Sequence, residues 1–261
     1  MLRSVRATRY VMPFREGGSV PALVEADDLG LYVVKLRGAG QGARALVAEL
    51  VSGELARACE LAVPEIVRVT LDRALAASEP DPELCLPLEA STGLNLGLDY
   101  LPGSIAFDPV AGPAPDLVTA SRTVLFDAFV ANIDRTAKNT NLLWWHGRLW
   151  LIDHGASLYF HHGWGPGNRL EGSDDAFFEV KHHVLLPWAS KLGDAAVHLA
   201  RALTGEIFES IVSEIPATWL GDLGFANVEA ERGAYVAWLR ARALALPLIL
   251  QEAERARAIP V

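Results

Sequence analysis

Three polar side chains in one short stretch of the chain could hold a metal–phosphate complex beside an attacking hydroxyl group. Asp134 and Asn139 are five residues apart, and Asp153 follows after a short insertion. A carboxylate such as Asp134 can orient a hydroxyl or accept its proton, while Asn139 and Asp153 offer oxygen ligands to a magnesium ion that bridges phosphates. Two protein ligands are enough, because magnesium keeps several waters and phosphate oxygens. The spacing therefore indicates an ATP-dependent phosphotransferase.

The residues between Asn139 and Asp153 explain how these two side chains can meet. Residues 141–145 and 148–152 are rich in strand-forming side chains. His146-Gly147 separates them, and two residues of this kind suit a tight hairpin turn. We expect the hairpin to return Asp153 to the neighbourhood of Asn139.

An aspartate followed five residues later by an asparagine is a common pattern, and Asp127 with Asn132 repeats it. That second pair belongs to an apolar run, residues 123–131, which reads as a buried helix with no hairpin leading to a third ligand. We set this pair aside as a catalytic candidate. For Asp134 and Asn139, the alternative to catalysis is a polar loop whose side chains cap turns.

Composition narrows the class of protein. The 261 residues are 51% hydrophobic, which is ample for a folded core, and the formal net charge of −9 argues against a nucleic-acid or anionic-membrane surface as the main function. No apolar stretch is long enough to span a membrane, and the N-terminal residues lack the apolar centre of a signal peptide. Cys59 and Cys85 suggest neither zinc nor a disulfide framework, and both are expected to be reduced thiols. We expect a soluble, cytoplasmic protein that acts on a protein or a small molecule.

The N-terminal part reads as a small antiparallel β-rich unit with one main helix. Strand-like patterns cover residues 5–12, 22–26, 31–36, 66–71 and 94–101. Residues 43–61 show apolar side chains at helical steps, and residues 81–90 favour a second, short helix.

Glycine-rich segments beside these strands could lay backbone amides over phosphates. One is the loop of residues 15–19, which contains Gly17, Gly18 and Ser19. An ordinary hairpin loop explains it equally well. The other segment follows the third strand, and there Gly38, Gly40 and Gly42 could approach phosphate instead.

The rest of the chain is mostly helical. Residues 102–115 are rich in Pro and Gly and mark a connection between an N-terminal unit, residues 1–101, and a C-terminal unit, residues 116–261. Beyond the connection, helices are expected over residues 116–131, 182–191, 194–202, 207–214 and 229–253. The fold class is therefore α+β.

This order of elements, together with three motifs, resembles the HipA-like kinases, which have a bilobal protein-kinase-like fold related to that of phosphoinositide lipid kinases. The motifs are Tyr32-Val33-Val34-Lys35, Ile133-Asp134-Arg135-Thr136-Ala137-Lys138-Asn139 and Ile152-Asp153-His154-Gly155. The similarity covers most of residues 5–160. It implies a small β-rich N-lobe, a larger helical C-lobe, and ATP and Mg²⁺ as cofactors.

The resemblance also implies a role for each site residue. Lys35 would contact the nucleotide phosphates and pair with Glu49, Asp134 would be the catalytic aspartate, and Asn139 and Asp153 would bind the metal. Lysine makes up only 4 of the 23 basic residues, so its presence at the end of an apolar strand supports a specific role for Lys35. For Glu49, a solvated position on the helix surface is the alternative.

Two positions depart from the family pattern. Thr136 stands where HipA and lipid kinases usually carry histidine, and His154 stands where eukaryotic-type kinases carry phenylalanine. Neither change removes a ligand or a proton acceptor. The resemblance favours a protein serine or threonine as the phosphate acceptor. A small-molecule phosphotransferase and a pseudokinase that binds nucleotide or a partner without catalysis are the alternatives, and the oligomeric state is open.

Overall fold

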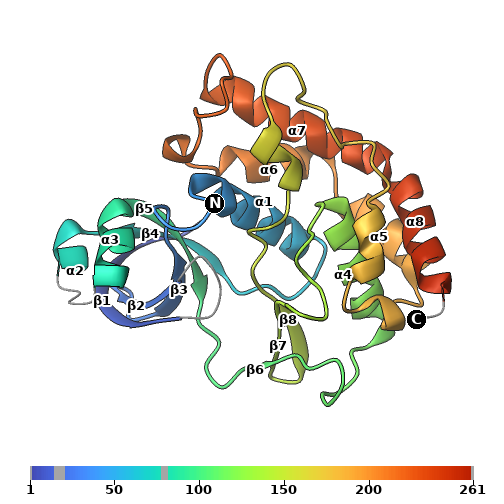
Figure 1. Ribbon diagram of the computed structural model, residues 1–261, viewed down its shortest axis with the longest axis horizontal. Helices are drawn as coiled ribbons and strands as arrows, with labels where there is room; N and C mark the ends of the chain where they lie inside the picture. Colours follow the sequence, from blue (N-terminus) through green and yellow to red (C-terminus); the bar gives the residue numbers. More distant parts are fainter. Residues whose placement is uncertain (1, 15–20, 78–81, 260–261) are drawn as a thin grey trace.

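The computed structural model describes residues 2–14, 21–77 and 82–259. Within these ranges, five strands close into a barrel in the order β1-β2-β3-β5-β4 (Figure 1). The strands are β1 (Ser4–Pro13), β2 (Ala22–Ala26), β3 (Leu31–Lys35), β4 (Ile66–Leu71) and β5 (Gly93–Asp99).

The barrel differs from the expected antiparallel unit at one pair of strands. The first residues of β1 run parallel to β4, with Ser4 opposite Arg68, whereas the later residues of β1 run antiparallel to β2. This parallel pair closes the barrel and removes the exposed strand edges that an open sheet would leave. Side-chain periodicity shows which face of a strand is buried but not which strands are neighbours, so the closure could not be predicted from it.

The helix α1 (Ala43–Ala58) lies between the barrel and the C-terminal helices (Figure 1). Apolar residues on all its faces are buried, as expected for a helix that packs against protein on every side. Gly53 permits the close approach to the barrel, because a Cβ at this position would lie 2.4 Å from Ile66 Cδ1. Glu49 is in the buried centre of this helix.

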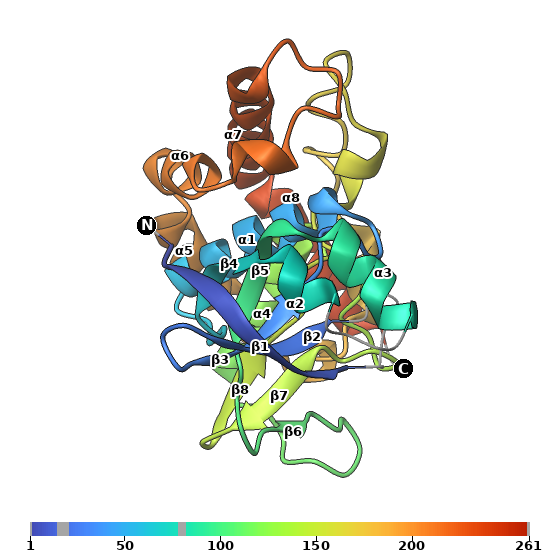
Figure 2. The same ribbon diagram turned by 90° about the vertical axis from the view of Figure 1, so that its left-hand side faces the viewer.

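A second sheet of three strands carries the expected hairpin. Its strands are β6 (Ile105–Ala106), β7 (Leu142–Trp145) and β8 (Arg148–Leu151), and it lies beside the barrel at the bottom of Figures 1 and 2. His146 and Gly147 both have positive φ, 49° and 71°, which is the conformation of a type I′ turn. The predicted hairpin is therefore present. The short strand β6 was not expected, because its two residues lie inside the Pro/Gly-rich connection.

The C-terminal part is helical, with two differences from expectation. Its α-helices are α4 (Leu117–Phe129), α5 (Leu192–Ala202), α6 (Gly205–Ser213), α7 (Val228–Leu244) and α8 (Leu246–Ala258). The helix expected over residues 182–191 is wrong: the chain forms two short 3₁₀ turns, Phe178–His182 and Leu186–Trp188, and Pro187 has no N–H for a continuous helix. The single helix expected over residues 229–253 is two helices that meet at Ala245, because Pro247 lies in the first turn of α8, where proline is tolerated, and could not continue α7.

Two small helices, α2 (Arg73–Ala77) and α3 (Pro82–Ala90), lie between β4 and β5. The second matches the short helix expected there, and α2 was not expected. Figure 2 shows both on the outside of the barrel.

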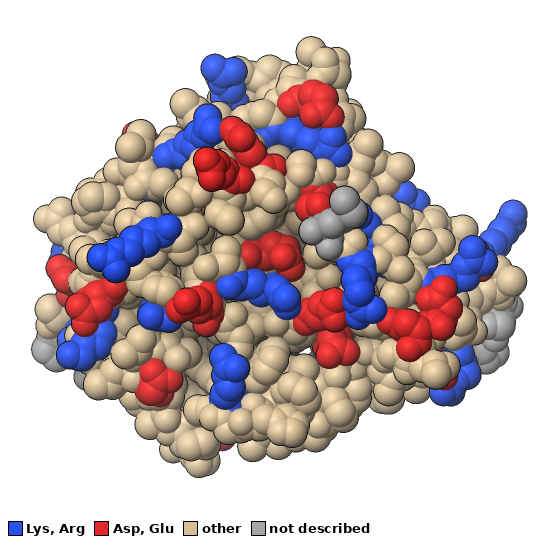
Figure 3. All heavy atoms as spheres, turned by 180° about the vertical axis from the view of Figure 1, so that it is seen from behind, with Lys and Arg blue, Asp and Glu red and all other residues tan. Residues whose placement is uncertain are grey.

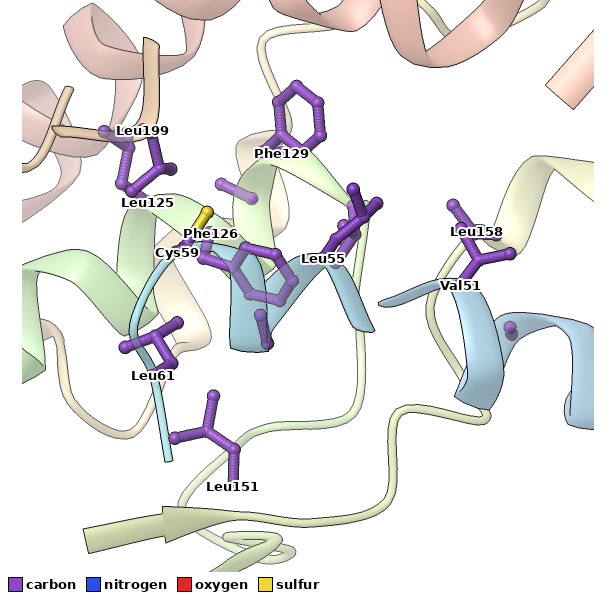
Figure 4. Packing of buried hydrophobic residues seen from close by; sticks show 14 of the residues in the cluster. Val51, Leu55, Cys59, Leu61, Leu125, Phe126, Phe129, Leu151, Leu158 and Leu199 are labelled. Atoms are coloured by element: carbon purple, nitrogen blue, oxygen red, sulfur yellow. The ribbon is translucent and has the colours of Figure 1, made fainter. Parts of the chain in front are cut away.

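The main core joins α1 to the helical part. Leu55 of α1 and Cys59, which follows the helix, pack with Leu125, Phe126 and Leu151 (Figure 4). Burial raises the pKa of the Cys59 thiol to about 12, and both cysteines are free. A hydrophobic cluster that α1 and α4 share fixes the barrel relative to the residues that follow α4.

Acidic and basic side chains are interspersed on the face seen from behind Figure 1 (Figure 3). Among the described residues, no single helix is long and apolar enough to cross a membrane. Helices α7 and α8, bent by 58° at their junction, pass that test of length and composition only when they are taken together.

Candidate functional site

Asp134 lies in the loop between α4 and β7, and hydrogen bonds within that loop fix its carboxylate. Asn139 Nδ2 donates to Asp134 Oδ2 at 2.7 Å, and Asn141 Nδ2 donates to the same oxygen at 3.2 Å. The backbone N–H of Asp134 donates to the side chain of Asn132. These contacts leave Asp134 Oδ1 available to a substrate, and the structure thus brings Asp134 and Asn139 together.

A cluster of buried charged and polar side chains anchors the loop that carries Asp134. Asp127, on α4, is fully buried and accepts hydrogen bonds from Arg135 Nε at 2.6 Å, Asn132 Nδ2 at 3.0 Å and His183 Nε2 at 2.9 Å. Burial alone would raise the pKa of Asp127, but Arg135 and His183 outweigh burial and hold it well below its usual value. Asp127 and Asn132, set aside as a catalytic pair, thus anchor the loop that carries Asp134.

Arg135 connects this cluster to the hairpin. Its guanidinium group donates to the backbone carbonyl of Asn141, just before β7, and to that of Ile152, just after β8, at 3.3 Å in the second case. Arg135 therefore ties the Asp134 loop to both ends of the hairpin. The signal for this cluster in the sequence was Asp127, a charged residue inside an apolar helix. Burying such a charge costs free energy unless it is paired.

The hairpin returns Asp153 to the site as expected. Ile152 N–H donates to Asn141 O at 3.1 Å, which places the end of β8 beside the Asp134 loop. Asp153 follows with a positive φ of 55°, a conformation that aspartate tolerates better than most residues. Its side chain is 42% exposed and faces the same cavity as Asp134 and Asn139.

Lys35, at the end of β3, is the residue of the barrel that reaches the site. Its Nζ donates to Glu49 Oε2 at 2.6 Å and also contacts Asp153 Oδ1. Lys35 is 8% exposed and Glu49 is 0% exposed, so the alternative of a solvated helix residue does not hold for Glu49. Burial lowers the pKa of Lys35, but the charges of Glu49 and Asp153 outweigh this and raise it above its usual value. The pair is therefore ionised at neutral pH.

One cavity of about 310 Å³, between the barrel and the Asp134 loop, is lined by Lys35, Asp134, Asn139 and Asp153. Its wall also includes Gly40, Gln41 and Gly42 at the start of α1, and Gly155 after Asp153. Gly38 has a different role, because it packs against Ala90, where a Cβ would lie at 2.5 Å. Of the two glycine segments considered from the sequence, the second therefore contributes to the cavity. Gly17, Gly18 and Ser19 lie outside the described residues.

The oxygen atoms in this cavity suit a metal ion that is bound together with phosphate groups. Among the residues that the structure describes, no group of three or more His, Cys, Asp or Glu side chains forms a site that could hold a metal ion. Asn139 uses its Nδ2 to bind Asp134, which leaves its carbonyl oxygen for a cation, and Asp153 has a second carboxylate oxygen beyond the one that contacts Lys35. One carboxylate and one amide oxygen fit Mg²⁺ when phosphates and waters complete its shell.

His154, immediately after Asp153, is fully buried beneath the site. Its Nδ1 lies 3.6 Å from Glu49 Oε1, and its ring meets Phe126 edge to face. Thr136, the other departure from the family pattern, forms a β-bridge with His183. The histidine pairs serve structural or surface roles: His183 binds Asp127, His161 Nδ1 lies 3.2 Å from the Tyr235 hydroxyl, and His182 is exposed.

The chain has the fold of a kinase. The crystal structure of CtkA, a proinflammatory kinase of Helicobacter pylori, matches with a TM-score of 0.62 and 10% identity over 98% of this chain and 99% of that chain. The Golgi casein kinase matches with a TM-score of 0.50 and 12% identity over 97% of this chain and 72% of that chain. A structure of that kinase with Mn/ADP bound matches equally well, over 96% and 73%.

The family model for HipA-like kinases matches residues 8–233. The chain therefore belongs to the HipA-like kinase family, which confirms the resemblance seen in its motifs. A comparison with curated proteins finds no match.

Proposed function

We propose that the protein is an ATP- and magnesium-dependent kinase that transfers the γ-phosphate of ATP to a serine or threonine hydroxyl of a protein. Residues 1–101 would form the nucleotide-binding lobe and residues 116–261 the catalytic lobe, joined by residues 102–115. Membership of the HipA-like kinase family and the kinase fold support the class of reaction.

One observation carries the proposal. Lys35, paired with the buried Glu49, lines a single cavity together with Asp134, Asn139 and Asp153. These side chains come from the barrel, α1, the loop after α4 and the hairpin, and an arrangement assembled from four separate elements is not explained by local turn capping. Positioning and charge stabilisation supply most of the catalysis in phosphoryl transfer, and this set offers both.

Each residue then has a distinct task. Lys35 binds phosphate oxygens, and Glu49 holds its ammonium group in place. Asn139 and Asp153 would hold a magnesium ion, which neutralises charge on the phosphates when it is bound. Asp134 orients the acceptor hydroxyl towards the γ-phosphorus. As the new O–P bond forms and the bond to the ADP oxygen breaks, the hydroxyl proton passes to the Asp134 carboxylate.

The Golgi casein kinase with bound Mn/ADP supports a nucleotide and a divalent cation as cofactors, because it shares the fold of this chain. The names of both structural neighbours describe kinases, and casein is a protein, which favours a protein acceptor over a small molecule.

The acceptor class can be tested with γ-labelled ATP and a cell lysate separated by size into proteins and small molecules. We expect Mg²⁺-dependent labelling of the protein fraction on serine or threonine, absent with Asp134→Asn. Labelling confined to the small-molecule fraction would contradict the protein acceptor but leave the kinase reaction standing. If the protein binds ADP but label reaches neither fraction, and the protein does not label itself, a pseudokinase is favoured.

A further inference from the structure

A second, larger cavity of about 870 Å³ is lined in part by Ala131 and Ile133, which precede Asp134 in the chain. Its wall combines residue 133, residues of the 159–179 segment and residues of α7. Ile133 lines this cavity, while the next residue, Asp134, lines the cavity of Lys35 and Asp153. Because consecutive Cα atoms are about 3.8 Å apart, the two cavities come close to each other at the proposed catalytic residue. A segment bound in the larger cavity would therefore lie near Asp134.

Apolar side chains in this cavity face solvent. Ile133 is 39% exposed, Tyr159 is 55% exposed and Phe178 is 56% exposed; the first precedes Asp134, and the other two lie near the two ends of the 159–179 segment. Large aromatic side chains usually gain free energy by burial, so several exposed ones in a single hollow are typical of a surface that a partner covers. Their exposure also distinguishes the cavity from the enclosed pockets that surround most of a small ligand.

The lining presents negative charge to its occupant. Glu171, Asp175 and Glu179 line the cavity, and Glu179 is exposed, with His182 Nε2 3.9 Å away. Asp175 uses one carboxylate oxygen to accept the N–H of Phe177, which leaves the other oxygen available. A cationic group on the occupant would find carboxylates on this wall.

The one arginine among the described residues of the wall offsets this charge only in part. Arg242 is 0% exposed, and its guanidinium group donates to the backbone carbonyls of Ala128 and Phe129 at 2.6 and 3.0 Å and also to that of Asp175. Burial and the nearby charge of Arg44 lower the pKa of His162, which favours the neutral form of its ring. Among the described residues on the wall of this cavity, carboxylates therefore outnumber the cationic groups.

We infer that this cavity, bounded by Ile133, Tyr159, Phe178 and the three carboxylates, is the docking groove for the acceptor protein. It would take an extended segment with a lysine or arginine and an apolar side chain near the phosphorylated serine or threonine. The inference rests on the proposed kinase function for the transfer step, but the binding of such a segment does not require transfer.

Direct binding is the test, because it can fail independently of catalysis. Fluorescence anisotropy with ADP and Mg²⁺ present would compare two labelled serine peptides that share one aromatic residue and differ only in carrying arginines or glutamates. We expect the arginine peptide to bind more tightly. Equal binding of the two, or tighter binding of the glutamate peptide, would overturn the inference.

Two exposed positions make the test specific. Glu179→Lys should weaken binding of the arginine peptide about fivefold and narrow its advantage over the glutamate peptide. Phe178→Ser should weaken both peptides, because each carries the aromatic residue. Glu89→Lys makes the same charge change on α3, on the outside of the barrel, and should leave both affinities as in the wild type. Equal effects of Glu179→Lys and Glu89→Lys would mean that general charge, and not this groove, selects the peptide.

Transfer measurements separate the two proposals. If the arginine peptide binds as expected but no phosphate is ever transferred, the proposed kinase function is wrong, while the groove remains a peptide-binding site. If phosphate transfer to the protein itself occurs while neither peptide binds, the kinase function stands and the groove as an acceptor site is refuted. The groove as an acceptor-protein site would also be refuted if cationic small molecules were phosphorylated and neither peptide reduced this labelling.

Discussion

Lys35 and Glu49 form an ion pair at 2.6 Å in a part of the molecule that is almost closed to water. The lysine comes from the last residue of β3 and the glutamate from the middle of α1, so the pair connects the barrel to the helix that packs against the rest of the protein. A buried carboxylate that loses its partner is strongly destabilising, because its charge is then uncompensated.

Lys35→Met should therefore reduce both activity and stability. We expect γ-phosphate transfer to fall by at least about 100-fold and the free energy of unfolding to fall by about 3–5 kcal/mol. The double variant Lys35→Met/Glu49→Gln removes both charges and should recover part of the stability but none of the activity. Denaturant unfolding and label transfer on the same samples measure the two effects. Full stability in Lys35→Met, or recovered transfer in the double variant, would contradict the assigned roles.

The support of the Asp134 loop by Arg135 leads to a second prediction. Arg135 is buried and joins Asp127 to the carbonyls of Asn141 and Ile152, and a lysine cannot make these contacts from one ammonium group. Arg135→Lys should lower the unfolding free energy by about 3–5 kcal/mol and reduce transfer, because it leaves Asp127 poorly paired.

The matched control is Arg148→Lys, the same substitution at an exposed position of the hairpin that Arg135 contacts. We expect it to change the unfolding free energy by no more than about 0.5 kcal/mol. If thermal unfolding showed the same midpoint for both variants, Arg135 would not be the residue that ties the loop to the hairpin.

His161 provides a prediction on pH. Burial, assisted by His162 and Arg44, lowers the pKa of His161 from 6.5 to about 3. Below pH 6.5 the unfolded chain binds a proton at this position that the folded protein does not, so acidification favours unfolding. The contribution of His161 is a loss of about 1.4 kcal/mol of unfolding free energy per pH unit between about pH 6 and pH 4.

Denaturant titrations at several pH values measure this slope. His161→Gln cannot titrate and can still contact the Tyr235 hydroxyl, so its unfolding free energy should fall less steeply with acid than that of the wild type. His146→Gln controls for the loss of an exposed histidine. Parallel curves for the wild type and His161→Gln would show that His161 does not stay neutral in the fold.

Local sequence patterns predicted the parts of the structure that depend on residues close together in the sequence. The His146-Gly147 turn, the hairpin and the return of Asp153 all follow from a few consecutive side chains. The helix at residues 43–58 was also predictable, from its apolar periodicity. The spacing of Lys35 and Glu49 in the sequence does not predict that they pair. The pair was expected only from the resemblance to the HipA-like kinases.

Contacts between distant segments account for what the sequence did not show. Closure of the barrel by β1 and β4 depends on strand neighbours, and periodicity does not report these. Asp127 was assigned to a buried helix correctly, but its partners Arg135 and His183 come from later segments. The helix expected over residues 182–191 failed because Pro187 and the hydrogen bonding of His183 favour short turns there.

The central claim is that Asp134 and Asp153 act on a nucleotide bound beside Lys35, and single-turnover release of the γ-phosphate from ATP tests it most directly. Wild-type protein, Asp134→Asn and Asp153→Asn would be mixed with γ-labelled ATP, Mg²⁺ and acceptor, after ADP binding has shown that each sample is folded. We predict that Asp134→Asn keeps its affinity for ADP and transfers phosphate about 100- to 10,000-fold more slowly. Asp153→Asn should lose the dependence of nucleotide binding on Mg²⁺. Equal transfer rates in all three proteins would contradict the assignment of this cavity as the active site.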